Sequence, residues 1–180
     1  MKRLISAAAG LALLAAAGAA SAAQVSVSIG PELQKQSRAY GADEVRTLAD
    51  DLRTTVQRAL DRAGPSAPQR VDLVLEAAHP NRPTFNEMSA STGLSLRSIG
   101  VGGAAVTGTV TTSDGASQPL SYRWFEDDLK NVIGYSTWTD ADRAFQSLAS
   151  QLARGHVPNQ GPYHPDLQAR AAFDSYDRFR

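Results

Sequence analysis

The chain contains no cysteine among its 180 residues. This absence excludes disulfide bonds, thiolate metal sites, a cysteine nucleophile and a lipid attached through a thiol. A domain without disulfides in an oxidising compartment has to be stabilised by side-chain packing alone.

Histidine is scarce as well, since the chain has only His79, His156 and His164. A zinc site needs three or four His, Cys, Asp or Glu ligands at close spacing. His156 and His164 do not share a helix face, because Pro158 and Pro162 lie between them. We expect exposed loop histidines and predict no metal site and no cofactor.

Motifs of nucleophilic catalysis are missing from the sequence. No Gly-x-Ser-x-Gly elbow is present, and His79, placed before Pro80 at a strand end, is the one candidate base in an ordered segment. A Ser-His-Asp triad assembled in space stays open as an alternative. The neighbouring acids Asp50 and Asp51 point about 100° apart on a helix and are interpreted as solvated surface.

A phosphate-binding loop is not indicated either. Gly100, Gly102 and Gly103 are followed by no Gly-Lys-Ser/Thr sequence, and they precede a strand rather than a helix. We interpret these glycines as a bend or a close backbone approach where a strand begins. The sequence therefore predicts no catalytic or cofactor-binding residue.

An excess of positive charge is also absent. Without Lys2 and Arg3 the 18 Lys and Arg residues become 16, against 18 Asp and Glu. Nucleic-acid-binding proteins usually show a basic excess, so no nucleic-acid partner is expected.

The N-terminus carries the pattern of a cleavable signal peptide. Lys2 and Arg3 precede an apolar run over 4–20, and Ala20-Ser21-Ala22 is a small-x-small cleavage site. The alternative, a membrane anchor, is less favoured because the run is short and mostly alanine. We predict a mature chain from about Ala23, free in the periplasm or secreted, with no stable membrane anchor after cleavage.

Hydrophobic periodicity predicts the elements of the mature chain. Apolar residues alternate in strands at 25–29 and 71–77, in a strand with a bulge over 94–101, and in a hairpin of 104–111 and 120–125. An edge strand is possible at 132–135. Residues 31–41 and 84–93 are expected to be loops.

Apolar residues at three- and four-residue steps predict two helices. The first covers 42–63, and the second covers 140–154 with Thr139 as its N-cap and Asp142 at N3. Residues 156–166 are predicted to be extended, and 167–179 to be a short helix or disordered.

This element order predicts an α+β fold of two layers, with a mainly antiparallel sheet of four to six strands and two helices on one face. The predicted organisation is a signal peptide over 1–22, a single domain over 23–155 and an extended or partly disordered tail over 156–180.

Aromatic residues are concentrated around the hairpin and the last helix. Tyr122, Trp124, Phe125, Tyr135 and Trp138 lie close in sequence. We interpret them as core or core-edge packing. The functional alternative is an aromatic patch for a partner or a glycan on the open face of the sheet.

One stretch resembles a pattern in uncharacterised bacterial envelope proteins and lipoproteins. It runs from Gly102-Gly103-Ala104 through Asp114-Gly115 to the Trp-x-Asp-Ala-x-x-Ala-Phe sequence of 138–145. The resemblance extends over about 45–153. The Trp-x-Asp-Ala-x-x-Ala-Phe run also has a structural rationale, since Trp138 can dock the helix start while Phe145 anchors its inner face. The resemblance implies no catalytic residues. More loosely, the element order is similar to that of the amino-terminal domain of TolB-like periplasmic proteins.

These observations predict a non-enzymatic accessory domain of the bacterial cell envelope. The expected partner is an envelope protein or a cell-wall component, bound at exposed edges of the sheet. Two alternatives stay open, a periplasmic hydrolase and a soluble carrier of a small apolar ligand.

Overall fold

The computed structural model describes residues 23–132 and 136–164. The predictions for the signal peptide, for Tyr135 and for 167–179 lie outside the described residues. At Val132, the one described residue of the possible edge strand 132–135, no strand forms, because the chain there leaves a short 3-10 turn, Leu129–Asn131.

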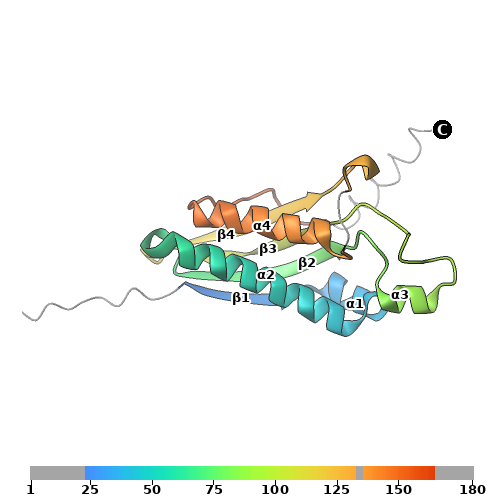
Figure 1. Ribbon diagram of the computed structural model, residues 1–180. Coiled ribbons are helices and arrows are strands. Elements are labelled where there is room, and N and C mark those ends of the chain that lie inside the picture. The colour runs from blue at the N-terminus through green and yellow to red at the C-terminus, as the bar shows by residue number, and fades with distance from the viewer. Residues whose placement is uncertain (1–22, 133–135, 165–180) are drawn as a thin grey trace, which may run out of the picture.

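Four strands form one mixed, open sheet in the order β1-β2-β3-β4 (Figure 1). Its strands are β1 Gln24–Ile29, β2 Arg70–His79, β3 Gly103–Thr111 and β4 Ser117–Phe125. The β1–β2 pair is parallel, and the β2–β3 and β3–β4 pairs are antiparallel. The predicted mainly antiparallel sheet is therefore confirmed.

Two long helices cover one face of this sheet, as predicted (Figure 1). Helix α2, Ala42–Ala63, packs on β1, and α4, Thr139–Ala153, packs on β3 and β4. The predicted N-cap is wrong, because Trp138 occupies that position and the Thr139 hydroxyl bonds to Ser136 instead. No helix within the described residues has the length and apolar composition of a membrane span.

The core lies between the sheet and these helices. Alternate strand residues point into it, so that Val71, Leu73 and Leu75 of β2 are at most 2% exposed. Helix α4 contributes Phe145 at 1% exposure, which confirms its expected place on the inner face. Tyr122 and Trp124 face the same core, which confirms the packing interpretation for both residues.

Residues 31–41, expected to be a loop, form helix α1, Pro31–Tyr40. Pro31 suits the first helical turn because it needs no amide partner there. The helix buries Leu33 and Ser37 at four-residue spacing, while its other side is polar. The expectation was wrong because this narrow buried face is hidden in a polar sequence.

The strand expected over 94–101 does not form. This segment consists of turns. The loop expected over 84–93 is wrong in part, because the short helix α3, Phe85–Ala90, forms there with Thr84 as its N-cap. Leu94 and Leu96 alternate with serines, but β2 and β3 already pair with each other where this segment leaves the sheet. The segment pairs with no strand, so its alternating residues remain in irregular structure and face solvent.

Candidate functional site

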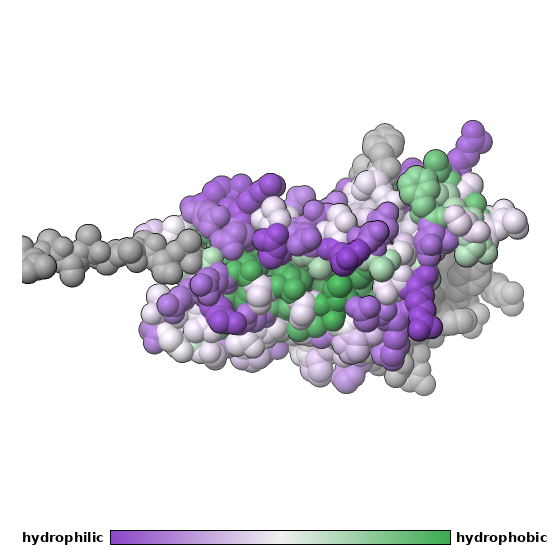
Figure 2. All heavy atoms as spheres, turned by 90° about the horizontal axis from the view of Figure 1, so that it is seen from below, coloured by the Kyte–Doolittle hydropathy of each residue, from purple (hydrophilic) through white to green (hydrophobic). Residues whose placement is uncertain are grey.

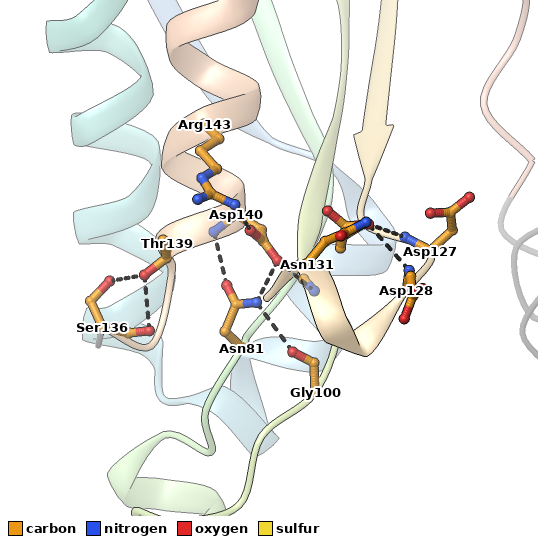
Figure 3. Close-up of polar contacts among 11 residues, drawn as sticks. Asn81, Gly100, Asp127, Asp128, Asn131, Ser136, Thr139, Asp140 and Arg143 are labelled. Atoms are coloured by element: carbon orange, nitrogen blue, oxygen red, sulfur yellow. Dashed lines mark hydrogen bonds and ion pairs between the residues drawn. The ribbon is translucent and has the colours of Figure 1, made fainter. Parts of the chain in front are cut away.

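A buried polar cluster joins the end of β2 to the start of α4 (Figure 3). Asn81 and Asp140 are both 0% exposed. The Asn81 amide Nδ2 donates to the Asp140 carboxylate at 2.5 Å, and the Asp140 backbone N–H donates to Asn81 Oδ1 at 2.8 Å. The carboxylate also accepts from the Gly102 N–H at 3.2 Å and from Arg143 at 3.1 Å.

The main chain of Asn81 is bonded as well. Its N–H donates to the Thr137 carbonyl, its carbonyl accepts from the Gly100 N–H, and its side chain donates to the Gly100 carbonyl. With so many partners and no exposure, Asn81 and Asp140 have a structural role. They clamp together the two ends of the segment 82–101, which we call the extension.

The close packing of Gly102 completes this clamp. A Cβ at that position would lie 2.7 Å from Asn81 Oδ1 and 2.8 Å from the His79 carbonyl oxygen. Gly103 has φ +148°, and its Cβ would collide with the Trp124 carbonyl oxygen. The predicted close backbone approach is therefore confirmed at Gly102 and Gly103, whereas a Cβ at Gly100 would make only an ordinary contact, 3.8 Å from the Pro80 carbonyl oxygen.

The extension has a fixed internal structure. Thr84 and Glu87 form a capping box at the start of α3, and Thr84 is 1% exposed. The Asn86 amide donates to the carbonyls of Arg38 and Ala39 at the end of α1, and Arg82 donates to the Leu96 carbonyl. The segment is thus held at its ends and along its length.

Large apolar side chains of the extension nevertheless face solvent. Among the described residues its exposed members are Phe85 (74%), Leu94 (39%), Leu96 (61%), Ile99 (55%) and Val101 (40%). The extension projects beyond the end of the sheet (Figure 1), and hydrophobic surface appears at the same end of the molecule in Figure 2. Exposed apolar groups gathered in this way mark interaction sites.

The two outer edges of the sheet differ. At β4 the chain itself supplies the neighbour: Ser121 N–H donates to the Pro158 carbonyl, and Gln160 N–H donates to the Ser121 carbonyl. The Arg123 N–H donates to the Gln160 side chain at 2.7 Å, and Pro119 has no N–H to offer. Residues 158–160 therefore cover the middle of this edge.

No described residue pairs with the outer edge of β1. Its even-numbered residues bond to β2, as the donation from the Gln24 N–H to the Gln69 carbonyl shows. The main-chain groups of Val25, Val27 and Ile29 therefore point outward. The strand has no charge, proline or bulge, which are the usual means of protecting an edge.

Within residues 23–132 and 136–164, no hydrogen bond or ion pair joins a histidine side chain to a serine hydroxyl or a carboxylate. His156 and His164 are exposed, as expected, but His79 is half-buried, so the expectation of an exposed loop position was wrong for it. Its ring packs on Phe125, with centroids 5.1 Å apart. No described group of three or more His, Cys, Asp or Glu side chains has the arrangement of a metal site.

Burial lowers the pKa of the His79 imidazole below its usual value of 6.5. A lowered folded-state pKa means that the unfolded chain takes up the proton first as the pH falls. We therefore expect the free energy of unfolding to decrease from about pH 7.5 to about pH 5.5, because protonation favours the unfolded chain. Urea unfolding of the wild type and of His79→Gln tests this, and an equal decrease in both would contradict it.

The acids at Asp50 and Asp51 are exposed. Asp50 pairs with Arg53 at 3.4 Å. Asp51 lies on the α4 side, where its charge adds to the effect of burial in raising the pKa of Asp142. The interpretation as solvated surface is confirmed for both residues.

Trp138 docks the start of α4 against α1 and α2. Its indole N–H donates to Glu44 at 3.0 Å, and its ring meets Tyr40 edge to face at 5.6 Å. The expected docking role is thus confirmed, with the partners now identified. Burial first, then the nearby acidic groups of Glu87 and Tyr163, raise the pKa of Tyr40 to about 12.

The exposed apolar surface of the extension was not predicted from the sequence. The signal was present, because Leu94, Leu96, Ile99 and Val101 lie among serines and glycines, but it was interpreted as a strand. The clamp of Asn81 and Asp140 had no sequence signal, since 59 positions separate its members.

Comparisons with known proteins add little. No protein-family model matches the chain, and no similar protein was found among the curated sequences. A solved structure, described as a minor lipoprotein from Acinetobacter baumannii, aligns over 78% of this chain and 98% of its own, with 14% identity and a TM-score of 0.30. A score this low supports no argument about fold or function, and membership of the resembling envelope family stays a prediction.

Proposed function

We propose that this protein is an exported, non-enzymatic binding domain of the cell envelope that holds a partner protein on its extension. The observation that carries the proposal is the set of exposed apolar side chains on a segment clamped at both ends. Phe85, Leu96 and Ile99 are each more than half exposed. Full burial of one such side chain contributes about 1.5–3 kcal/mol, so a partner that covers several gains substantial affinity.

The rigidity of the extension supports the same proposal. Ordering a loop on binding costs free energy, whereas a segment already held in place avoids that cost. The clamp at Asn81, the capping box at Thr84 and the tether at Asn86 provide this order before binding. The extension therefore has the properties of a preformed docking surface.

A protein fits this surface better than a lipid bilayer. Residues 91–102 have no helix or strand, so their main-chain polar groups would lose hydrogen bonds to water inside hydrocarbon. A protein partner offers polar groups as well as apolar contacts at its interface. The predicted export places that partner in the envelope.

Site-specific photo-crosslinking in the native cell tests the proposal. A photoreactive residue at Leu96 is expected to give a discrete adduct with one envelope protein. The same residue at Ser117, exposed at the opposite end of the sheet, serves as the matched control. Substitution of Phe85 by serine should reduce the Leu96 adduct by about tenfold, since an exposed interface anchor is worth 1–2 kcal/mol or more.

Three outcomes would contradict the proposal. They are the absence of any protein adduct at Leu96, equal adducts at Leu96 and Ser117, and an adduct with lipid alone. Thermal unfolding of Phe85→Ser serves as the folding control, because Phe85 is 74% exposed and its loss should leave stability nearly unchanged.

A further inference from the structure

From the outer edge of β1, we infer a second interaction that is independent of the extension: two copies of this chain pair through their β1 strands, antiparallel and centred on Val27. The inference starts from the main chain. Val25, Val27 and Ile29 direct their N–H and C=O groups to that edge. Another extended segment can satisfy this whole row of alternating donors and acceptors, which makes the edge a template for strand addition.

The sequence of β1 is complementary to itself in this arrangement. A two-fold axis through Val27 places Val27 opposite its own copy and Val25 opposite Ile29 of the second copy. These are hydrogen-bonded pairs, in which each residue exchanges both main-chain bonds. All three side chains lie on the helix-covered face and are half-buried in one chain, so pairing extends the apolar layer.

The other face is complementary too. Ser26 lies opposite Ser28 of the second copy, and both serines are exposed in a single chain. Figure 2 looks onto the β1 side of the molecule and shows a band of hydrophobic surface bordered by hydrophilic surface. Pairing through β1 covers this band and leaves its polar borders at the rim, as in protein interfaces generally.

In the paired sheet the helix layers of the two copies lie on the same side. Helix α2 packs on β1, and α4 packs on β3 and β4. The two-fold axis therefore makes α2 of the second copy the neighbour of α2 in the first.

The charges on α2 favour a second copy of this chain, rather than an unrelated strand, as the partner of β1. The Gln57 side chain donates to the Ala23 carbonyl at 2.8 Å, which places Gln57 over the start of β1. Arg46, Asp50 and Arg53 share its flank, because they lie 11, 7 and 4 positions before it in the helix. This flank therefore faces the second copy.

Strand and helix rise per residue give the residue of α2 beside which the two-fold axis passes. Val27 lies about 13 Å along the strand from Ala23. The same distance covers about nine helical residues, so the axis passes near Leu48. About Leu48, Arg46 comes opposite Asp50 of the second copy and Asp43 comes opposite Arg53. Within one chain Arg46 already pairs with Asp43 and Arg53 with Asp50, and the two-fold axis sets opposite charges against the members of these two pairs.

Light scattering and sedimentation of the mature chain, from Ala23, test the inference, and a dimer is expected. Because the chain has no cysteine, a single introduced cysteine shows by crosslinking whether its position faces its own copy in the β1–β1 pair. Oxidised Val27→Cys is expected to crosslink, since paired Cα atoms lie about 5.5 Å apart. Ser26→Cys is the matched control and should crosslink poorly, because Ser26 faces Ser28 and not its own copy.

A charge reversal provides a second and independent test. Arg46→Asp should weaken the dimer by about tenfold or more through repulsion from Asp50, and Arg46→Asp with Asp50→Arg should restore it. A monomeric wild type, equal crosslinking at both cysteine positions, or a reversal without effect would each overturn the inference. Circular dichroism of each variant verifies folding, and failure of the dimer leaves the extension proposal untouched.

Discussion

Replacement of Asn81 by alanine is expected to lower the free energy of unfolding by about 3 kcal/mol. The change removes the Nδ2 donor from the Asp140 carboxylate and the Oδ1 acceptor from the Asp140 N–H. It also leaves the Gly100 carbonyl without the side-chain donor. Buried groups that lose partners cannot recover them from water, because Asn81 and Asp140 are 0% exposed.

Urea unfolding followed by circular dichroism measures this loss. Asn86→Ala is the matched control, since Asn86 also donates to two acceptors but is exposed. Its carbonyl acceptors gain water when the side chain is removed, so a loss of about 1 kcal/mol or less is expected. Equal losses in the two variants would show that burial of the clamp contributes nothing to stability.

Phe145→Ala is the second substitution with a large expected effect, a loss of about 3–5 kcal/mol. Phe145 is 1% exposed and lies on the inner face of α4, against the sheet. Truncation to alanine removes apolar contacts and leaves a cavity in a core that collapses only in part. The helix that packs on β3 and β4 then loses its largest anchor.

The matched control for this substitution is Phe85→Ala. The side-chain deletion is the same, but Phe85 is 74% exposed on the extension. A change within about 0.5 kcal/mol is expected. Denaturant midpoints of the two variants, compared with the wild type, test the contrast. A large loss in Phe85→Ala would mean that the extension packs more tightly than its exposure indicates.

The parts of the fold that periodicity predicted are those with wide apolar faces. Helix α2 was predicted with its observed bounds, Ala42–Ala63, because its apolar stripe repeats through the whole helix. The hairpin of β3 and β4 was predicted because both strands alternate around a turn at Asp114-Gly115. In both places local pattern and tertiary burial agree.

The wrong predictions fall where the apolar face is narrow or where the local pattern has no partner in the fold. Helix α1 buries Leu33 and Ser37 only, so its pattern is weak, although Pro31 after Gly30 is a recognisable start. Leu94 and Leu96 alternate as a strand would, yet a strand also requires a neighbour, which a pattern within one segment does not show. Both errors therefore arise because a local sequence pattern does not show which distant segments pack or pair with each other.

The clamp illustrates the same limit at the level of single residues. Asn81 and Asp140 each look like ordinary surface-type residues in the sequence, and only the fold brings them together. Trp138 was predicted to dock the start of α4, but its partners Tyr40 and Glu44 lie on α1 and α2, far away in the chain.

The segment beside β4 has a consequence for how far an assembly of this protein can grow. Residues 158–160 occupy the middle of the β4 edge, and Pro119 removes a donor from it. Head-to-tail joining of a β1 edge to a β4 edge would repeat without end and produce a fibre, whereas an isologous contact closes on itself. With the middle of the β4 edge covered, an assembly that pairs through β1, as we infer, would close at two copies.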